Sequence, residues 1–364
     1  MLLLKLEGKN IRNLDNFSVR CCPCANIIYG KNGSGKTSLL EAIYLLGRGR
    51  SFRNRDSRTV IKAGQSELVV SAQVDRHQSG IVSKIGVLRT SKGGFEARQD
   101  GRVIRTAGEL AAQLPLQLIH AQSFLLLEGG ALQRRQFLDW GVFHVEHSYM
   151  RLWRRFHKAL KQRNQLLKHD RLRLSELDLW SRELVGLSNL VAEKREEYLQ
   201  LLIEEVSNIC LGFNSFVGMS IEYYRGWDRQ NNLEEILVKD LERDRKYGKT
   251  HQGAHRADLV VRIGGDPVAS FLSRGQIKSL VYVLKLAQAA IFQRKTGLKC
   301  IFLLDDLPSE LDFWHRDYLL TSLNQLSCQY FMTGVDRNDF ANIIGKNSHQ
   351  IFHVDKGQLA IRYN

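Results

Sequence analysis

The sequence contains no long hydrophobic run. No stretch of about 18 apolar residues occurs among its 364 residues, so no membrane-spanning helix is predicted. The opening residues, MLLLKLEGKNIRNL, are too short and too quickly charged to form a signal peptide. They are better explained as an edge strand, and a cytoplasmic location is expected.

Cysteine is scarce, and its spacing does not match a structural zinc site. Cys21, Cys22 and Cys24 cluster as CCPC, whereas Cys210, Cys300 and Cys328 stand alone. Structural zinc usually needs two spaced pairs of ligands, and no second pair follows the cluster. We therefore expect reduced thiols near a strand and no metal at this position.

Acidic residues are outnumbered, with 38 Asp and Glu against 53 Lys and Arg, which gives a net charge of +15. This excess favours a polyanionic partner, above all DNA or RNA. No base-reading module is visible, so recognition of a particular base sequence is not expected.

The positive charge is concentrated in residues 134–173, where acidic neighbours are few. A run of this kind is usually a solvated face, and DNA contact is the alternative. The basic residues concerned are Arg134, Arg135, Arg151, Arg154, Arg155, Lys158, Lys161, Arg163, Lys168, Arg171 and Arg173.

A phosphate-binding motif is the most informative feature that is present. Residues 29–43, YGKNGSGKTSLLEAI, fit the pattern G-x-x-x-x-G-K-[ST] between a short apolar strand and a helix. Its glycines let backbone N–H groups point at phosphate oxygens, Lys36 reaches the β- and γ-phosphates, and Thr37 offers a hydroxyl to Mg²⁺. The residues predicted to hold ATP are Gly30, Lys31, Asn32, Gly33, Ser34, Gly35, Lys36, Thr37 and Ser38.

Two acidic residues supply the second element that such a site needs. In residues 301–312, IFLLDDLPSELD, an apolar strand delivers Asp305 and Asp306 at its carboxyl end. We expect Asp305 to hold Mg²⁺ through water and Asp306 to orient or deprotonate the attacking water. The alternative is two acids that only cap the next helix.

A second anion site is predicted at the start of a long helix. In residues 271–288, FLSRGQIKSLVYVLKLAQ, a hydroxyl from Ser273, a backbone N–H near Gly275 and the helix dipole converge.

The remaining pattern predicts strands at both ends of the chain and helices between them. Residues 81–106 form an antiparallel meander around two glycine turns, and residues 115–121 form a buried strand that ends at Gln122. Helical periodicity predicts an antiparallel pair, residues 149–167 and a partner whose start Ser175 caps. Strands at residues 299–304 and 329–332 and a terminal hairpin about Lys356 and Gly357 complete the pattern.

Together the phosphate loop, the LSRGQ helix and the DDxxSELD segment resemble the ATPase heads of the ABC class, in its SMC/Rad50-like branch. Three further segments narrow the resemblance to the RecF family, over nearly the whole chain. They are GRGRSFRNRDSRTVI (47–61), RRQFLDWGVF (134–143) and GAHRADL (253–259).

The resemblance implies an α/β fold, an ABC-type P-loop ATPase head that combines a mixed sheet with an antiparallel β subdomain and carries an inserted helical arm lobe. Residues 1–125 and 253–364 would form the ATPase lobe and residues 126–252 the arm.

The resemblance also implies roles for individual residues. Gln122 would sense Mg²⁺ and water, and Ser309 and Asp312 would lie on a loop that crosses a dimer seam. The signature residues Ser273, Arg274, Gly275 and Gln276 would act on the nucleotide of a second protomer.

The sequence departs from the family pattern at three places. Thr333 and Gly334 stand where ABC transporters carry a switch histidine, which argues against fast hydrolysis. Pro308 replaces a small residue, and Ala254 replaces a proline. Arg48, Arg50, Arg53 and Arg55 follow the phosphate-loop helix, either as a basic surface loop or as contacts to nucleotide or DNA.

The function implied is that of a slow, DNA-stimulated ATPase that dimerises on ATP at single-strand gaps during repair, replication and the SOS response. By resemblance it would work with RecR and RecO to load RecA. The alternatives are a nucleotide or metabolite kinase, a transporter ATPase and the ATPase subunit of a Rad50-like nuclease.

Overall fold

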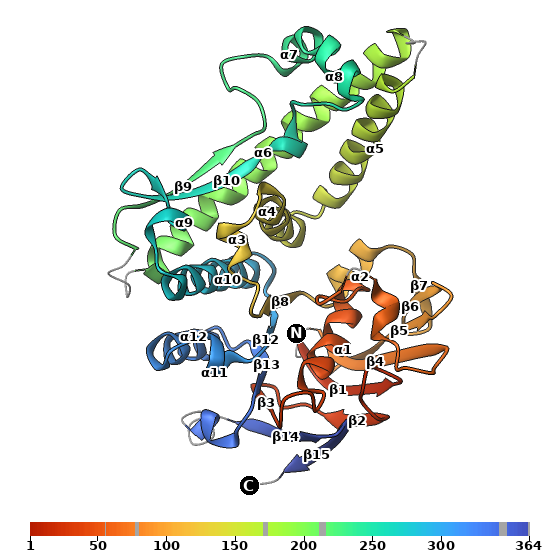
Figure 1. The fold of residues 1–364 in the computed structure, drawn as a ribbon, viewed down its shortest axis with the longest axis vertical. Coiled ribbons are helices and arrows are strands. Elements are labelled where there is room, and N and C mark those ends of the chain that lie inside the picture. Colours follow the sequence, from red (N-terminus) through yellow and green to blue (C-terminus); the bar gives the residue numbers. More distant parts are fainter. Residues whose placement is uncertain (55, 77–79, 170–173, 211–215, 342–347, 363–364) are drawn as a thin grey trace. The chain divides into compact units, whose positions relative to one another are not determined.

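The computed structural model describes residues 1–54, 56–76, 80–169, 174–210, 216–341 and 348–362. The chain divides into two compact units (Figure 1). Unit 1 comprises Met1–Ser123 and Phe292–Asn364, and unit 2 comprises Phe124–Ile291. No described helix is both long and apolar enough to cross a membrane.

A mostly parallel sheet forms the centre of unit 1. Its strand order is β15-β14-β3-β13-β12-β8, and only the β14–β15 pair is antiparallel within the described residues. The strands are β3 (Ala25–Tyr29), β8 (Leu116–Ile119), β12 (Ile301–Leu304), β13 (Gln329–Gly334), β14 (His349–Asp355) and β15 (Gln358–Arg362). Strands β12 and β13 are buried along their whole length, as expected for a sheet covered on both faces. The terminal hairpin about Lys356 and Gly357 is confirmed.

Helices follow these parallel strands and begin beside their carboxyl ends (Figure 1). Helix α1 (Lys36–Arg48) follows β3, and α11 (Leu307–Glu310) and α12 (Phe313–Gln325) follow β12. The short helix η4 (Arg337–Phe340) follows β13. Because neighbouring parallel strands end at one edge, their loops converge there.

An antiparallel sheet completes unit 1, in the order β2-β1-β4-β5-β6-β7. Its strands are β1 (Leu2–Lys9), β2 (Phe17–Arg20), β4 (Glu67–Asp75), β5 (Val82–Thr90), β6 (Phe95–Gln99) and β7 (Arg102–Ile104), accompanied by η1 (Ser57–Val60) and α2 (Ala107–Gln113). The predicted meander is confirmed. The predicted edge position of the first strand is wrong, because β2 folds back and pairs with the side of β1 that β4 leaves open.

Unit 2 is built around a long helical hairpin. Helices α5 (Tyr149–Leu167) and α6 (Leu174–Cys210) pack side by side, as Figure 1 shows. The predicted helix at residues 149–167 is confirmed with the same bounds. The predicted cap is wrong, because Ser175 lies inside α6.

Smaller elements pack around this hairpin. They are α3 (Leu125–Glu128), α4 (Ala131–Val145), α7 (Leu233–Lys239), α8 (Leu241–Tyr247), η3 (Ala254–Arg256), α9 (Val268–Phe271), α10 (Arg274–Thr296) and a sheet of β9 (Met219–Tyr224), β10 (Asp258–Ile263) and β11 (Asp266–Pro267). We expected the ATPase lobe to resume at residue 253. The unit boundary lies instead at Phe292, because β10 and most of α10 contribute to the core of unit 2.

Candidate functional site

The phosphate loop connects β3 to α1 and is shaped by glycine. Gly30 has a φ of 154°, and a Cβ there would lie 2.1 Å from the Val354 carbonyl oxygen. Gly35 has a φ of 120°, and its Cβ would lie 2.5 Å from a methyl group of Leu14. Only glycine accepts both the backbone angle and the close approach at these positions. The loop is therefore pressed against its surroundings on two sides.

Lys36 occupies the inside of the loop. Its Nζ donates to the carbonyl oxygens of Gly30 at 2.7 Å and Lys31 at 3.1 Å. Burial lowers the pKa of Lys36, and the carboxylates of Asp306 and Asp305 act in the opposite direction. The ammonium group therefore stands where the motif needs a positive charge, and its present partners are uncharged carbonyls, for which anionic phosphate oxygens can be exchanged.

The structure brings Thr37 and Asp305 together from positions far apart in the chain. The Thr37 hydroxyl donates to Asp305 Oδ1 at 2.9 Å, and the Thr333 hydroxyl donates to the same oxygen at 2.8 Å. Burial raises the pKa of Asp305, and these two hydrogen bonds act against that rise. Two hydroxyl groups thus hold one partly buried carboxylate at the carboxyl edge of the sheet. Sequence reasoning gave Thr333 no role, although its place after a buried strand next to β12 was a usable signal.

Asp306 has a strained backbone and an unsatisfied side chain. Its φ and ψ are 53° and 43°, and its backbone N–H donates to Thr333 Oγ1 at 2.7 Å. Within the described residues its Oδ1 atom is buried without a hydrogen-bond partner. Strain and an unpaired buried oxygen are both typical of functional sites.

These residues fit a magnesium ion. Mg²⁺ prefers oxygen ligands and usually binds one or two carboxylates together with substrate phosphates. The oxygens of Thr37 and Asp305 offer that chemistry. A cation would also relieve the cost of burying two carboxylates side by side.

Gln122 is not brought to this cluster by a described hydrogen bond. Strand β8 ends at Ile119, so the prediction that it runs to Gln122 is wrong. Gln122 lies exposed in the following turn, where His120 and Ser123 bond to each other. The turn chemistry of Ser123 ends the strand early.

Gly334 has no room for the switch histidine of transporters. A Cβ there would lie 2.4 Å from the Phe340 ring and 3.2 Å from Pro308 Cγ. Phe340 is fully buried, so it has little freedom to move away. Pro308 and Phe340 together explain why this position carries glycine.

The signature segment presents an exposed helix start. Ser273, Arg274 and Gly275 are exposed at the beginning of α10, and a Cβ on Gly275 would meet nothing within 4 Å. Gln276 N donates to Ser273 Oγ at 3.3 Å, and Ser273 N donates to Gln276 Oε1 at 2.9 Å. This reciprocal capping fixes the segment and leaves its N-terminal end open.

The segment after Asp306 is also accessible. Ser309 and Asp312 are both exposed, and the Asp312 carboxylate accepts the His315 backbone N–H at 3.0 Å. Asp312 therefore caps α12, which is a structural duty beside the predicted one.

The arginine-rich loop after α1 is anchored by a buried glutamate. Glu41 has no exposed surface and receives two hydrogen bonds from Arg12 and one from Ser51. Ser51 Oγ in turn accepts the Arg53 backbone N–H at 3.0 Å. Burial raises the pKa of Asp305, and the charge of Arg53 acts in the opposite direction. Arg55 lies outside the described residues.

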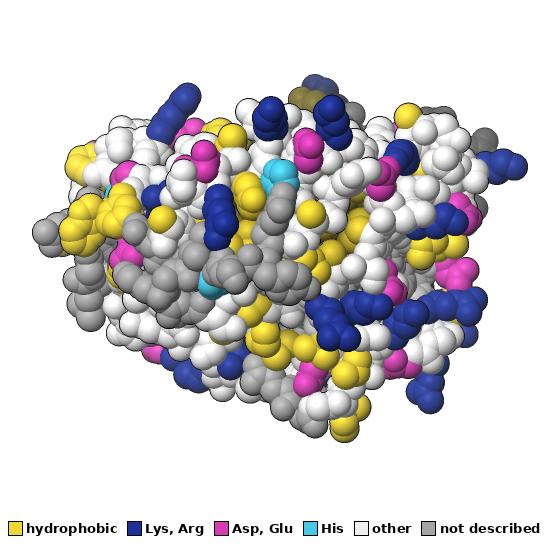
Figure 2. All heavy atoms as spheres, turned by 90° about the horizontal axis from the view of Figure 1, so that it is seen from below, with side chains coloured by type: hydrophobic (Ala, Val, Ile, Leu, Met, Phe, Trp, Pro, Cys, Tyr) yellow, Lys and Arg dark blue, Asp and Glu magenta, His cyan; other side chains and the backbone are white. Residues whose placement is uncertain are grey.

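The basic stretch divides into exposed and structural residues. A stripe along α5 is exposed, and it consists of Arg151, Arg154, Arg155, Lys158 and Lys161. Three other predicted members are wrong, because they hold the fold. Arg134 pairs with Asp258 at 2.7 Å, Arg135 donates to the Ala257 carbonyl at 2.6 Å, and Arg163 is buried against Asp244 at 2.7 Å. Arg171 and Arg173 lie outside the described residues. The face drawn in Figure 2 carries both basic and acidic side chains, and several Lys and Arg side chains lie next to one another on it.

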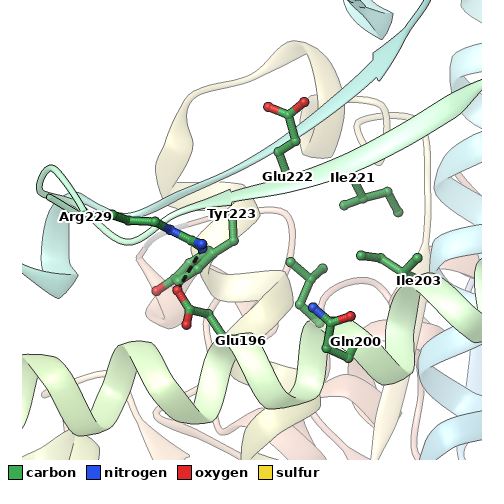
Figure 3. A pocket seen from close by; sticks show the side chains of 8 residues that line it. Glu196, Gln200, Ile203, Ile221, Glu222, Tyr223 and Arg229 are labelled. Atoms are coloured by element: carbon green, nitrogen blue, oxygen red, sulfur yellow. Dashed lines mark hydrogen bonds and ion pairs between the residues drawn. The ribbon is translucent and has the colours of Figure 1, made fainter.

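A cavity of about 440 Å³ lies in unit 2, between α6 and β9 (Figure 3). Ile203 and Ile221 give it an apolar wall, and Glu196, held by Arg229 at 2.9 Å, gives it an acidic one. None of the residues that line this cavity belongs to the phosphate loop or to the Asp305 cluster, so this cavity is not the predicted nucleotide site.

Comparison with known proteins agrees with the motifs. Residues 2–360 match the family described as the RecF/RecN/SMC N terminal domain. The chain is 44% identical to the DNA replication and repair protein RecF of Stutzerimonas stutzeri, covering 99% of this chain and 97% of that one. RecF of Pseudomonas syringae pv. syringae is 43% identical, with coverage of 99% and 98%.

Solved structures give the same result. The structure of the recombination mediator protein RecF with ATP, in the RecFOR pathway, matches with a TM-score of 0.89 and 26% identity, covering 100% of this chain and 98% of that one. An Smc head domain from Pyrococcus furiosus matches with a TM-score of 0.57 and 15% identity, covering 99% and 96%, which supports the fold alone. These full-length matches leave no support for the kinase and nuclease-subunit alternatives. The chain belongs to the RecF family of DNA replication and repair proteins, with the ABC-type head that its motifs predicted.

Proposed function

We propose that this protein is an ATP-dependent DNA-binding protein that dimerises on ATP and acts at single-strand gaps. The observation that carries the proposal is the convergence of Lys36, Thr37, Asp305 and Asp306 at one edge of the sheet. That set combines a cation for phosphate, a hydroxyl and carboxylate for Mg²⁺ and a second carboxylate for water. The protein would act in the cytoplasm, where the chromosome is.

In the proposed mechanism Lys36 leaves the carbonyls of Gly30 and Lys31 and binds phosphate oxygens. Thr37 and Asp305 would hold Mg²⁺, which would supply charge neutralisation at the phosphates when it is bound. Thr333 keeps the Asp305 carboxylate oriented. Asp306 accepts a proton from the attacking water, and its unpaired Oδ1 suits that task.

We propose that a second copy of the chain completes each site. The exposed start of α10 at Ser273 supports this, because backbone N–H groups and the helix dipole favour an anion there. ATP phosphates would then be shared between the loop of one protomer and the signature segment of its partner, with Ser309 near the seam. Tighter binding of ATP to the dimer than to the single protomer would drive association by mass action. Without a switch histidine, turnover would be slow.

DNA would contact the exposed stripe on α5. Its charges can neutralise backbone phosphates without reading bases, which suits a protein that recognises a gap and not a sequence. The name of the RecFOR pathway, to which the solved RecF structure belongs, supports RecO and RecR as partners. RecA loading would follow from that assembly.

Binding to gapped DNA tests this function. Wild type and Lys36→Ala would be titrated with ATP, with ADP and without nucleotide, each in the presence of Mg²⁺. The proposal expects tight binding only for wild type with ATP. Equal affinity in all six conditions would contradict it.

A further inference from the structure

Two carbonyl groups of the phosphate loop are held by residues from elsewhere in the chain. Asn13, between β1 and β2, donates from Nδ2 to the Gly33 carbonyl at 2.8 Å. The Gly357 backbone N–H, in the turn between β14 and β15, donates to the Ser34 carbonyl at 2.9 Å. Two segments, one near each end of the chain, thus hold the phosphate loop through these two hydrogen bonds, which we call the grip.

The two gripping segments also hold each other. The Asp15 backbone N–H donates to the Gly357 carbonyl at 2.9 Å, and a Cβ on Gly357 would lie 2.1 Å from the Asn13 carbonyl oxygen. On its other side Asn13 Oδ1 accepts the Ser38 hydroxyl at 3.0 Å. Asn13 therefore connects the loop, the first turn of α1 and the terminal hairpin.

This grip has a direct consequence for the donors of the loop. In a trans peptide the C=O and the following N–H point in opposite directions. Holding the Ser34 carbonyl toward Gly357 therefore turns the Gly35 N–H to the opposite side, away from Gly357. The loop thus has this donor oriented before any phosphate arrives, which lowers the ordering cost of binding.

We propose that Asn13 and Gly357 are positioning residues that preorganise the phosphate loop for nucleotide. The inference rests on the proposed nucleotide binding by this loop. It assigns a functional duty to the terminal hairpin, which carries no recognised motif. The loop would bind the phosphates that ATP and ADP share. The affinity for both nucleotides should therefore depend equally on the grip.

Asn13 can be tested against a matched residue in the same turn. Asn10 also donates its side-chain amide to a backbone carbonyl, that of Glu67 at 3.1 Å, but it does not contact the phosphate loop. Its φ of 58° is suited to glycine, so Asn10→Gly removes the amide without backbone strain. Asn13 is exposed, so Asn13→Ala should leave the protein folded.

The experiment measures the Kd of a fluorescent ATP analogue and of the matching ADP analogue with Mg²⁺, well below the melting temperature. Asn13→Ala should weaken the binding of both analogues by about threefold to tenfold, as expected for losing one or two neutral hydrogen bonds. Asn10→Gly should stay within about twofold of wild type. Amide hydrogen exchange without nucleotide should rise across residues 30–37 in Asn13→Ala and stay unchanged there in Asn10→Gly.

Gly357→Ala provides a second test, because its added Cβ should disturb the contact between Gly357 and the Ser34 carbonyl. This variant should weaken the binding of both nucleotides in the same way. Unchanged affinity in Asn13→Ala, or an equal loss in Asn10→Gly, would overturn the inference. Failure of the wild type itself to bind ATP would instead sink the proposed function.

Discussion

Thr333 donates its hydroxyl hydrogen to Asp305 at 2.8 Å, and its oxygen accepts the Asp306 backbone N–H at 2.7 Å. One side chain thus fixes both acidic residues of the site. It does so from β13, next to β12 in the sheet. Thr333 stands in the segment where transporters carry their switch histidine, and it has a different task, orientation of the carboxylates.

Removing the Thr333 hydroxyl should therefore damage both stability and turnover. Thr333→Val keeps the shape but leaves the buried Asp306 N–H unpaired, at a cost of about 1–3 kcal/mol in unfolding free energy. It also removes a bond that lowers the pKa of Asp305. Chemical denaturation and ATP turnover measure the two effects. Thr333→Ser keeps the hydroxyl, and if it behaves like the valine variant, the hydrogen bonds are not the cause.

Asp305→Asn should stabilise the nucleotide-free protein while it abolishes Mg²⁺-dependent ATP binding. Burial raises the pKa of Asp305, so the native state binds its proton more tightly than the unfolded chain. The charged side chain then costs stability as the pH rises above the usual aspartate range of about 4. Asparagine removes that cost and still accepts from Thr37 and Thr333. A rise in melting temperature at neutral pH without Mg²⁺ is expected, and a fall would contradict this account.

The protein should lose stability as the pH falls from about 6.5 to about 4. Burial lowers the pKa of His255 from 6.5 to about 4, with Arg256 and Arg135 acting in the same direction and the hydrogen bond to the Thr250 carbonyl oxygen opposing them. Between these two pH values the unfolded chain binds a proton at His255 and the native state does not. The free energy of unfolding therefore decreases as the pH falls, by up to about 3 kcal/mol.

Denaturant titrations between pH 4 and pH 7 measure this effect. His255→Asn removes the titrating group, so its stability should depend less steeply on pH across the window. The same slope in variant and wild type would assign the effect to other groups.

Arg163 and Lys161 are close in sequence and should behave in opposite ways. Arg163 is 1% exposed and bonds to Asp244 and Thr250, so Arg163→Gln should cost about 3–5 kcal/mol by leaving a buried charge unpaired. Lys161→Gln should leave the melting temperature unchanged and reduce the salt dependence of DNA binding by about one phosphate contact. An unchanged salt slope in Lys161→Gln would exclude this part of α5 from the DNA interface.

Ser273→Arg should separate nucleotide binding from dimerisation. Ser273 is far from the phosphate loop in sequence and sits at an exposed helix start, so a single protomer should still bind ATP. A bulky cation there should block the partner protomer and stop hydrolysis. Normal hydrolysis by this variant would show that the signature segment does not act in trans.

The local features of this protein were predictable from sequence. Residues that are neighbours in the chain are enough to predict the phosphate loop, the acidic pair Asp305 and Asp306, and the helix at residues 149–167. Contacts between distant segments were not predictable in this way. Nothing in the sequence around Gly357 indicates that its N–H binds Ser34, and Arg163 reads like its exposed neighbours until Asp244 is seen beside it. The prediction that β1 is an edge strand failed for the same reason, because the pairing of β2 with β1 depends on how the chain folds back.

Sedimentation velocity with saturating ATP, Mg²⁺ and gapped DNA tests the central claim most directly. Without nucleotide the protein should sediment as a monomer. With ATP it should shift to a dimer bound to the DNA, and Ser273→Arg should remain monomeric under the same conditions. A wild-type monomer in the presence of ATP and DNA would contradict the account of a site shared between two protomers.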